Sequence, residues 1–178
     1  MNCRVEGYTD EFGLDAWNEA DDATALDEML ACCGARHWAS AMVALRPIGS
    51  VMELREAADR IWAMMTEADW MEAFACHPRI GERKAEQALA KFAAWSRQEQ
   101  SSVAAATITV LTELDEGNAQ YEKRFEFTYI VCATGKTADE MLAILKRRLA
   151  NDREAELREA AEQQRQIMQI RLRKWLLE

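Results

Sequence analysis

The sequence predicts an all-α protein, a single-domain helical bundle of about seven to nine helices over residues 1–178. Three observations support this fold class. Seven glycines and two prolines in 178 residues provide few turn signals for β-hairpins. Apolar side chains recur every three or four residues along most of the chain, as they do on the buried face of a helix. The composition, 49% hydrophobic and 30% charged, is that of a globular chain with a core.

The first two predicted helices are defined by the residues at their ends. Asp21 or Asp22 can cap a helix that ends at Gly34. A short acidic side chain accepts hydrogen bonds from free N–H groups, and glycine readily adopts the left-handed conformation that closes a helix. The next helix carries Trp38, Met42 and Leu45 and stops before Pro47, because proline lacks the N–H that a helix interior needs.

Two further helices are predicted before residue 82. Ser50 and Glu53 form a capping-box pattern that opens the first of them. The second is short, contains Phe74, and breaks at Pro78 and Gly81.

The middle of the chain is predicted as two helices over residues 84–94 and 96–116, with a stop at Gly117 or Asn118. Residues 125–133 form an apolar and aromatic run. Such a short run is compatible with a strand or with a buried helix, because periodicity does not separate the two.

The last two helices are again predicted from their first residues. Thr137 and Glu140 repeat the capping-box pattern. Residues 151–152 then separate this helix from a long terminal helix.

Charge and cysteine content narrow the function classes. With 22 Lys and Arg against 31 Asp and Glu, the net charge is −9, which argues against a nucleic-acid partner. No apolar stretch is long enough to span a membrane, and the first residues lack a signal-peptide core, so we expect a cytoplasmic protein without a membrane partner. The five cysteines suggest neither a disulfide framework nor a zinc site.

The two histidines differ in their surroundings. His37 lies within an amphipathic helical pattern and is interpreted as structural. His77 falls at a predicted helix end, directly before Pro78, which restricts its backbone to extended geometry and so fixes where the ring points. An imidazole can donate or accept a proton near neutral pH. Taken alone, however, a His-Pro pair at a helix end is more often structural than catalytic.

A second polar group, Ser96, Glu99 and Gln100, would share one face of a helix. A hydroxyl, a carboxylate and an amide on one face could bind a small polar molecule. From these residues alone a simple capping box is the favoured interpretation.

Arg46, Arg148 and Arg171 lie in or beside apolar helical patterns. Each is expected either to pair with a carboxylate or to face a cleft. No phosphate-binding loop and no metal-ligand spacing occurs, so no cofactor and no metal is expected.

Several short motifs follow one another in an order that is specific as a set. They are residues 30–38, 46–47, 69–74, the run His77-Pro78-Arg79-Ile80-Gly81, Ser96 with Glu99 and Gln100, and residues 121–135, 148–151 and 167–172. With these motifs, which cover nearly the whole chain, the sequence resembles the 2-oxo-4-hydroxy-4-carboxy-5-ureidoimidazoline (OHCU) decarboxylase family, which forms (S)-allantoin in urate degradation.

The resemblance implies an all-helical homodimer that decarboxylates an anionic ureidoimidazoline without a cofactor. His77 corresponds to the catalytic proton donor of the family, and we expect Glu99 to keep its ring charged and oriented, since a neighbouring carboxylate favours the protonated imidazole. The implied substrate-binding residues are Pro78, Ser96, Glu99, Gln100, Tyr129, Ile130, Val131, Cys132, Ala133 and Arg171.

One residue departs from the family pattern. The family commonly has Phe-Gly-Phe where this chain has Phe125-Glu126-Phe127. A glycine there allows unusual backbone dihedrals, so Glu126 leaves open the local path of the chain toward residues 129–133.

Two other interpretations remain open on sequence grounds. The chain could be a non-enzymatic helical dimerisation or interaction module, in which case His77 would not share a cavity with the Ser96, Glu99 and Gln100 face. It could also be another enzyme of ureide breakdown on the same scaffold, which the release of carbon dioxide and the chirality of the product would distinguish.

Overall fold

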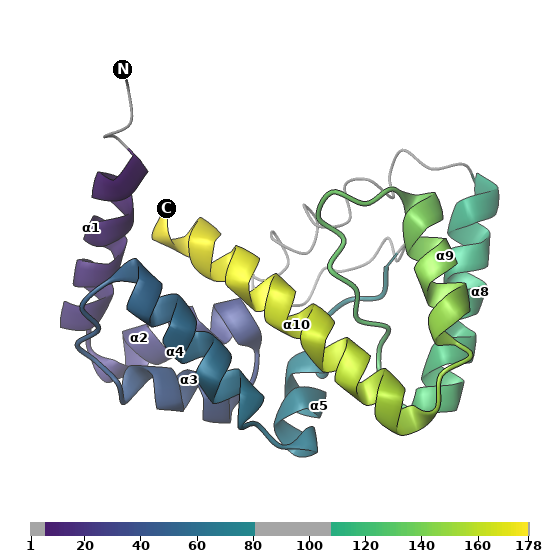
Figure 1. The fold of residues 1–178 in the computed structure, drawn as a ribbon, viewed down its shortest axis with the longest axis horizontal. Helices are drawn as coiled ribbons and strands as arrows, with labels where there is room; N and C mark the ends of the chain where they lie inside the picture. Colours follow the sequence, from purple (N-terminus) through teal and green to yellow (C-terminus); the bar gives the residue numbers. More distant parts are fainter. Residues whose placement is uncertain (1–5, 81–107, 178) are drawn as a thin grey trace. The chain divides into compact units, whose positions relative to one another are not determined.

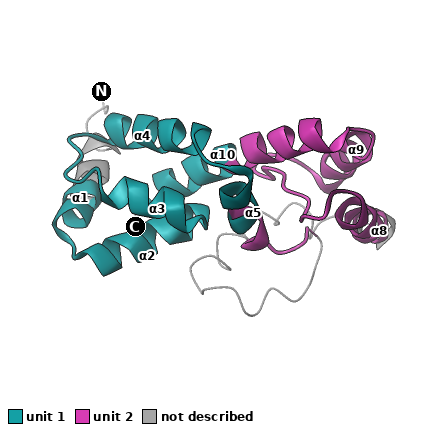
Figure 2. Cartoon of the chain, turned by 90° about the horizontal axis from the view of Figure 1, so that it is seen from below, with its two compact units in different colours: residues 1–72, 165–178 teal, residues 73–164 magenta. Residues whose placement is uncertain are grey.

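The computed structural model describes residues 6–80 and 108–177, and within these ranges it contains eight α-helices and no strand (Figure 1). This confirms the predicted all-α class. The chain divides into two compact units, residues 1–72 with 165–178 and residues 73–164 (Figure 2). Within the described ranges, no helix is both long and apolar enough to cross a membrane.

The first unit is built mainly from helices near the N-terminus. It contains α1 (Glu6–Glu19), α2 (Asp22–Cys33), α3 (Arg36–Val43), α4 (Val51–Ala63), the beginning of α5 (Glu67–Ala75) and the end of α10 (Arg153–Leu176).

Helix α2 begins and ends where the sequence predicts. The Asp21 side chain accepts a hydrogen bond from the Thr24 N–H at 2.9 Å, and Gly34 closes the helix with φ of 89°, its N–H donating to the Leu30 carbonyl at 2.8 Å. Helix α3 ends at Val43, two residues short of the prediction, and leaves the Leu45 side chain 47% exposed.

Trp17 and Trp38 are the most deeply buried tryptophans of the first unit, and both indole N–H groups have partners. Trp17 Nε1 donates to the Ala25 carbonyl and Trp38 Nε1 to the Ala58 carbonyl, both at 3.1 Å. Burial of these rings therefore leaves neither indole N–H unsatisfied.

Of the two alternatives for Arg46, the structure shows the first, an arginine paired with a carboxylate of the first unit. Its guanidinium donates to the carbonyls of Trp17 and Ala20, each at 2.7 Å, and forms an ion pair with Asp22. A cation is thus placed at the carboxyl end of α1, where it complements the helix dipole.

The second unit contains α8 (Ile108–Phe125), α9 (Ala138–Arg148), the first part of α10 and the end of α5. Helix α9 opens with the predicted capping box. The Thr137 side chain accepts from the Glu140 N–H, and the Glu140 side chain accepts from the Thr137 N–H. The long terminal helix is α10.

The predicted helix stop at Gly117 or Asn118 is wrong, because α8 continues to Phe125. A Cβ atom at Gly117 would lie 2.6 Å from Leu145 Cδ2, so the glycine makes room for α9 rather than ending α8. The predicted helix 84–94 and most of the predicted helix 96–116 lie outside the described residues.

Neither alternative for residues 125–133 is correct. Phe125 ends α8, and residues 128–133 form neither helix nor strand although Tyr129 to Ala133 are all buried. Several backbone groups of this stretch bond to side chains of other elements instead, as described below. The stretch therefore stays irregular in the interior of the second unit.

Candidate active site

His77 lies just beyond the end of α5. The helix ends at Ala75, the His77 N–H donates to the Phe74 carbonyl at 3.1 Å, and Pro78 follows. The side chain is half-buried, and its Nε2 atom is shielded from solvent. This placement agrees with the helix end predicted from the His-Pro pair.

Helix α8 contacts Arg79 and Ile80, two of the residues that follow His77. Asn118 Nδ2 donates to the Ile80 carbonyl at 2.8 Å, and Arg79 Nε donates to Glu122 Oε1 at 2.7 Å, with a second contact between the same two side chains. Asn118 and Glu122 are one helical turn apart, so one face of α8 contacts this segment. The backbone path after His77 is therefore set by two side-chain contacts.

The same helix supports the segment that precedes α9. Tyr121 packs edge-to-face against Phe127, with ring centroids 5.6 Å apart, and against Tyr129, at 5.2 Å. Phe127 also packs against Phe74 of α5, at 5.3 Å. Because aromatic rings pack rigidly at these distances, residues 127–129 and the end of α5 share one cluster.

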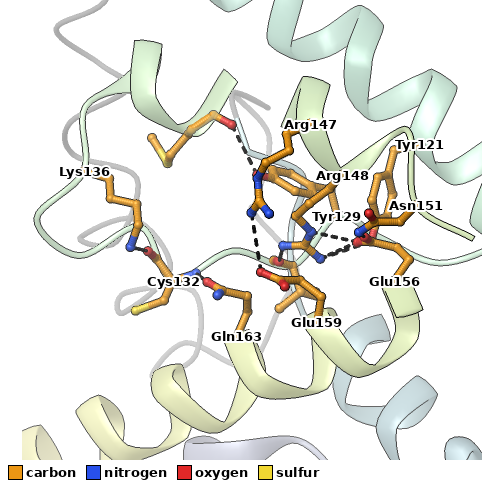
Figure 3. A network of polar contacts seen from close by, with 12 residues as sticks. Tyr121, Tyr129, Cys132, Lys136, Arg147, Arg148, Asn151, Glu156, Glu159 and Gln163 are labelled. Atoms are coloured by element: carbon orange, nitrogen blue, oxygen red, sulfur yellow. Dashed lines mark hydrogen bonds and ion pairs between the residues drawn. The ribbon is translucent and has the colours of Figure 1, made fainter. Parts of the chain in front are cut away.

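A buried ion pair lies beside Tyr121 and Tyr129 of this aromatic cluster (Figure 3). Arg148 and Glu156 have side chains with 0% exposure, and Arg148 Nε donates to Glu156 Oε1 at 2.8 Å. Glu156 also accepts from the Tyr121 hydroxyl and, at 2.8 Å, from Asn151 Nδ2. Arg148 Nη2 contacts Glu156 and the Tyr121 hydroxyl, and Nη1 donates to the Ile130 carbonyl at 2.6 Å. A buried pair of this kind is stable only when its other polar atoms are also bonded, as they are here.

Burial governs the protonation of the groups around this pair. It raises the pKa of the Tyr121 and Tyr129 hydroxyls well above the usual tyrosine value, against the opposing charge of Arg148. For Arg148 itself burial lowers the pKa, but the hydrogen bond to Glu156 and the neighbouring charges outweigh it, so the net shift is upward. Both tyrosines are thus neutral hydrogen-bond donors over the physiological range.

Two further side chains hold the backbone of Cys132 (Figure 3). The Cys132 N–H donates to Gln163 Oε1 of α10 at 2.9 Å, and Lys136 Nζ donates to the Cys132 carbonyl at 2.7 Å. Among the described residues, by contrast, the N–H and C=O of the buried Val131 have no hydrogen-bond partner.

The structure brings together some of the residues that the sequence singles out. His77, Pro78 and all of residues 129–133 lie in the second unit. Arg171 is fully buried and belongs to the first unit. Ser96, Glu99 and Gln100 lie outside the described residues. His37 has the structural character predicted for it, since its side chain is 66% exposed and pairs with Asp69 at 3.3 Å.

Sequence reasoning missed the residues that hold the two segments, namely Asn118, Glu122, Lys136, Glu156 and Gln163. For Glu156 a signal was available. Residues 157, 160, 161, 164, 168, 171 and 172 form the buried stripe of α10, and Glu156 lies beside it as a charged residue with no exposure. A charge at such a position indicates a buried partner.

Within residues 6–80 and 108–177, no group of three or more acidic, histidine or cysteine side chains could hold a metal ion.

The fold and these groups define an all-helical protein with a histidine at a helix end and a buried irregular peptide segment in the same unit. Residues 18–173 match the family model for OHCU decarboxylase. The chain therefore belongs to the OHCU decarboxylase family.

Relatives and a solved structure agree with this assignment. The chain is 38% identical over 149 residues to the uric acid degradation bifunctional protein TTL of Arabidopsis thaliana, covering 83% of this chain and 46% of that protein. It is 34% identical over 105 residues to the 2-oxo-4-hydroxy-4-carboxy-5-ureidoimidazoline decarboxylase of Amia calva, covering 54% of this chain and 55% of that protein. The matches thus span about half the length of these two curated relatives.

A crystal structure of OHCU decarboxylase in the presence of (S)-allantoin resembles this fold with a TM-score of 0.73 and 34% identity. The match covers 85% of this chain and 99% of that chain.

Proposed function

We propose that the chain decarboxylates 2-oxo-4-hydroxy-4-carboxy-5-ureidoimidazoline to (S)-allantoin in urate degradation, with His77 as the proton donor. The observation that carries this proposal is the placement of His77 within a family match that covers residues 18–173. His77 lies just beyond the end of α5, Arg79 and Ile80 are bonded to α8, and the same helix supports the peptide segment at residues 129–133 through Tyr121.

The chemistry requires no electron sink beyond the substrate. The bond between the ring carbon and the carboxylate breaks, carbon dioxide leaves, and the electron pair moves into the adjacent unsaturated ring system. Delivery of one proton to one face of the resulting carbanion then gives a single enantiomer. The protein has to orient the carboxylate, donate hydrogen bonds to the developing charge and supply that proton.

The described residues support separate parts of this task. A histidine whose Nε2 is shielded from solvent can deliver a proton to one face of a bound intermediate. The Val131 N–H and C=O are buried and unbonded among the described residues, which suits them to a ureido or ring amide that both donates and accepts. Between Val131 and Cys132, Val131 is the better candidate for bonding to the substrate through its backbone, because the Cys132 N–H is already bonded to Gln163.

The remaining site residues belong to the same proposal. Glu99 would keep the His77 ring charged and oriented, and Ser96 and Gln100 would orient the ureido group and ring amides. Arg171 would attract the anionic substrate in a protein of net charge −9. We also propose that the protein forms a homodimer and acts in the cytoplasm, which light scattering and cell fractionation would test.

The test compares the two histidines of the chain. Freshly generated substrate is added to the purified protein with a metal chelator present, and circular dichroism follows the formation of optically active allantoin. His77→Asn should reduce kcat by about 10²–10⁴-fold, the usual contribution of a positioned acid. The product should then be racemic.

His37→Asn is the matched control, because His37 is 66% exposed and only paired with Asp69. Its kcat should equal that of the parent. If His77→Asn keeps the parent rate and product chirality, His77 is not the proton donor. If the unmodified chain forms allantoin no faster than the spontaneous reaction, the proposed activity itself is wrong.

A further inference from the structure

We propose that Gln163 is a positioning residue that fixes the substrate-binding segment, residues 129–133, so that Val131 rather than Cys132 offers its backbone to the substrate. This inference rests on the proposed function. It concerns a side chain that does not itself contact the substrate and acts only through the Cys132 peptide.

The first step of the argument is that the segment has no regular structure to hold it. Residues 128–133 belong to no helix or strand, yet Tyr129 to Ala133 are between 1% and 5% exposed. The backbone groups of such a segment need partners other than those of a helix or sheet ladder, and three of them here bond to side chains. Its path therefore depends on the side chains that bond to it.

The second step is that these side chains bind alternate residues. Arg148 bonds to the Ile130 carbonyl at 2.6 Å, while Gln163 and Lys136 bond to the N–H and carbonyl of Cys132 at 2.9 and 2.7 Å. In Figure 3 the Gln163 side chain extends from α10 toward Cys132, and the Lys136 side chain reaches Cys132 from the side opposite Gln163. The intervening residue, Val131, is left with its backbone polar groups unbonded among the described residues.

The third step is that Gln163 can be tested separately from the fold. Arg148 is fully buried in an ion pair, so its replacement would leave Glu156 buried without its partner and destabilise the second unit. Gln163 is half-buried, and its bond to the Cys132 N–H is a single neutral hydrogen bond. Losing this bond leaves one buried neutral N–H without its acceptor, which costs less stability than a buried charge left without its partner.

The experiment compares three variants by circular dichroism with freshly generated substrate. Gln163→Met has nearly the same shape but no acceptor for the Cys132 N–H, and we expect kcat/KM to fall at least about tenfold, because small displacements of binding groups are costly. Gln163→Glu keeps an acceptor oxygen at the same reach and should recover most of that loss. Gln163→Asn withdraws the acceptor by one methylene, keeps the amide, and should resemble Gln163→Met.

Gln169→Met is the matched control on the same helix. Gln169 bonds to the Arg55 carbonyl and to Asp59, both in the first unit, so its loss removes hydrogen bonds but not the contact with Cys132. Its kcat/KM should equal that of the parent. Amide hydrogen exchange gives a second readout, since exchange at Cys132 should accelerate in Gln163→Met and Gln163→Asn but not in Gln163→Glu.

The outcomes separate this inference from the proposed function. If the unmodified chain yields no optically active product, the proposed function fails and this inference fails with it. If the unmodified chain is active and Gln163→Met and Gln163→Asn both match it, only the inference is overturned. Equal loss of kcat/KM in the Met and Glu variants, with unchanged thermal stability, would also overturn it, because the acceptor would then not be the cause.

Discussion

Glu126, the residue after the last turn of α8, has a backbone conformation that an L-residue rarely adopts. Its φ is 67°, and its N–H donates to the Glu122 carbonyl at 2.9 Å, so it closes the helix in the left-handed conformation. The side chain is exposed. Replacing it with glycine should therefore relieve backbone strain without removing a buried contact.

The magnitude follows from two opposing effects. A left-handed conformation costs a non-glycine residue about 1–2 kcal/mol. Glycine in turn loses more conformational freedom on folding, which costs about 0.5–1 kcal/mol. We expect Glu126→Gly to raise the free energy of unfolding by about 0.5–1 kcal/mol, measured from urea unfolding curves with an unchanged m-value.

Two control variants separate the backbone from the side chain. Glu126→Ala removes the carboxylate but keeps a Cβ atom, so the strain remains and stability should change by less than about 0.5 kcal/mol. Gly135 provides the reverse case, because its φ is 77° and a Cβ atom added there would meet nothing within 4 Å. Gly135→Ala should therefore lower the free energy of unfolding by about 1 kcal/mol through the dihedral alone.

The reasoning is refuted if Glu126→Gly is no more stable than Glu126→Ala. In that case the left-handed conformation would carry no cost at this position. The gain, if found, would also explain why a glycine is common here in the family that the chain resembles.

Two further predictions concern packing and pH. Gly117→Ala should lower the free energy of unfolding, measured in urea, by about 1 kcal/mol, because the new Cβ would lie 2.6 Å from Leu145 Cδ2. This loss is expected although alanine has a higher helix propensity than glycine. An equal or higher stability of the variant would contradict the clash. Hydrogen bonds from the Thr66 hydroxyl and N–H lower the pKa of Asp69 in the folded protein. The ionised carboxylate therefore stabilises the fold at pH values above the unfolded-state pKa of about 3.9. This stabilisation is lost as the pH falls through the lower folded-state pKa. Thr66→Ala should then be less stable than the parent by about 1 kcal/mol at pH 7, as for a lost helix cap, and the difference should shrink below about pH 4; a difference independent of pH would exclude the Asp69 contribution.

The helix ends that were predicted correctly depend on local chemistry. Asp21, Gly34 and the Thr137–Glu140 capping box bond to groups no more than four residues away, so a short stretch of sequence contains all the information needed. The same locality explains His77, since a helix end before proline can be inferred from the neighbouring residues alone.

The errors arise where distant residues decide the local structure. Gly117 looks like a helix stop, but its lack of a side chain is needed by Leu145, 28 positions later in the chain. Residues 125–133 look like a strand or a buried helix, but Cys132 is bonded to Gln163, a residue 31 positions away. No periodicity within a window of the sequence reports such contacts.

The site residues also divide into those predictable from neighbouring residues and those determined by distant contacts. His77 could be singled out from its own dipeptide, whereas Asn118 and Gln163 became recognisable only through the backbone groups they bond. Neither lies in a motif, because holding a backbone carbonyl or N–H requires only a side chain of suitable length at one position.

The buried pair of Arg148 and Glu156 shows why polar groups are retained in this core. Removing each of the two charges from water costs several kcal/mol, so replacing them with an apolar pair of similar volume would not by itself make the fold less stable. An apolar pair, however, would leave the Ile130 carbonyl and the Tyr121 hydroxyl without the partners they have here. A buried carbonyl without a donor costs about 1–3 kcal/mol. The ion pair is thus explained by the irregular segment that it supports. A binding site built from backbone groups requires a segment of this kind, with its path fixed by side chains because it belongs to no sheet.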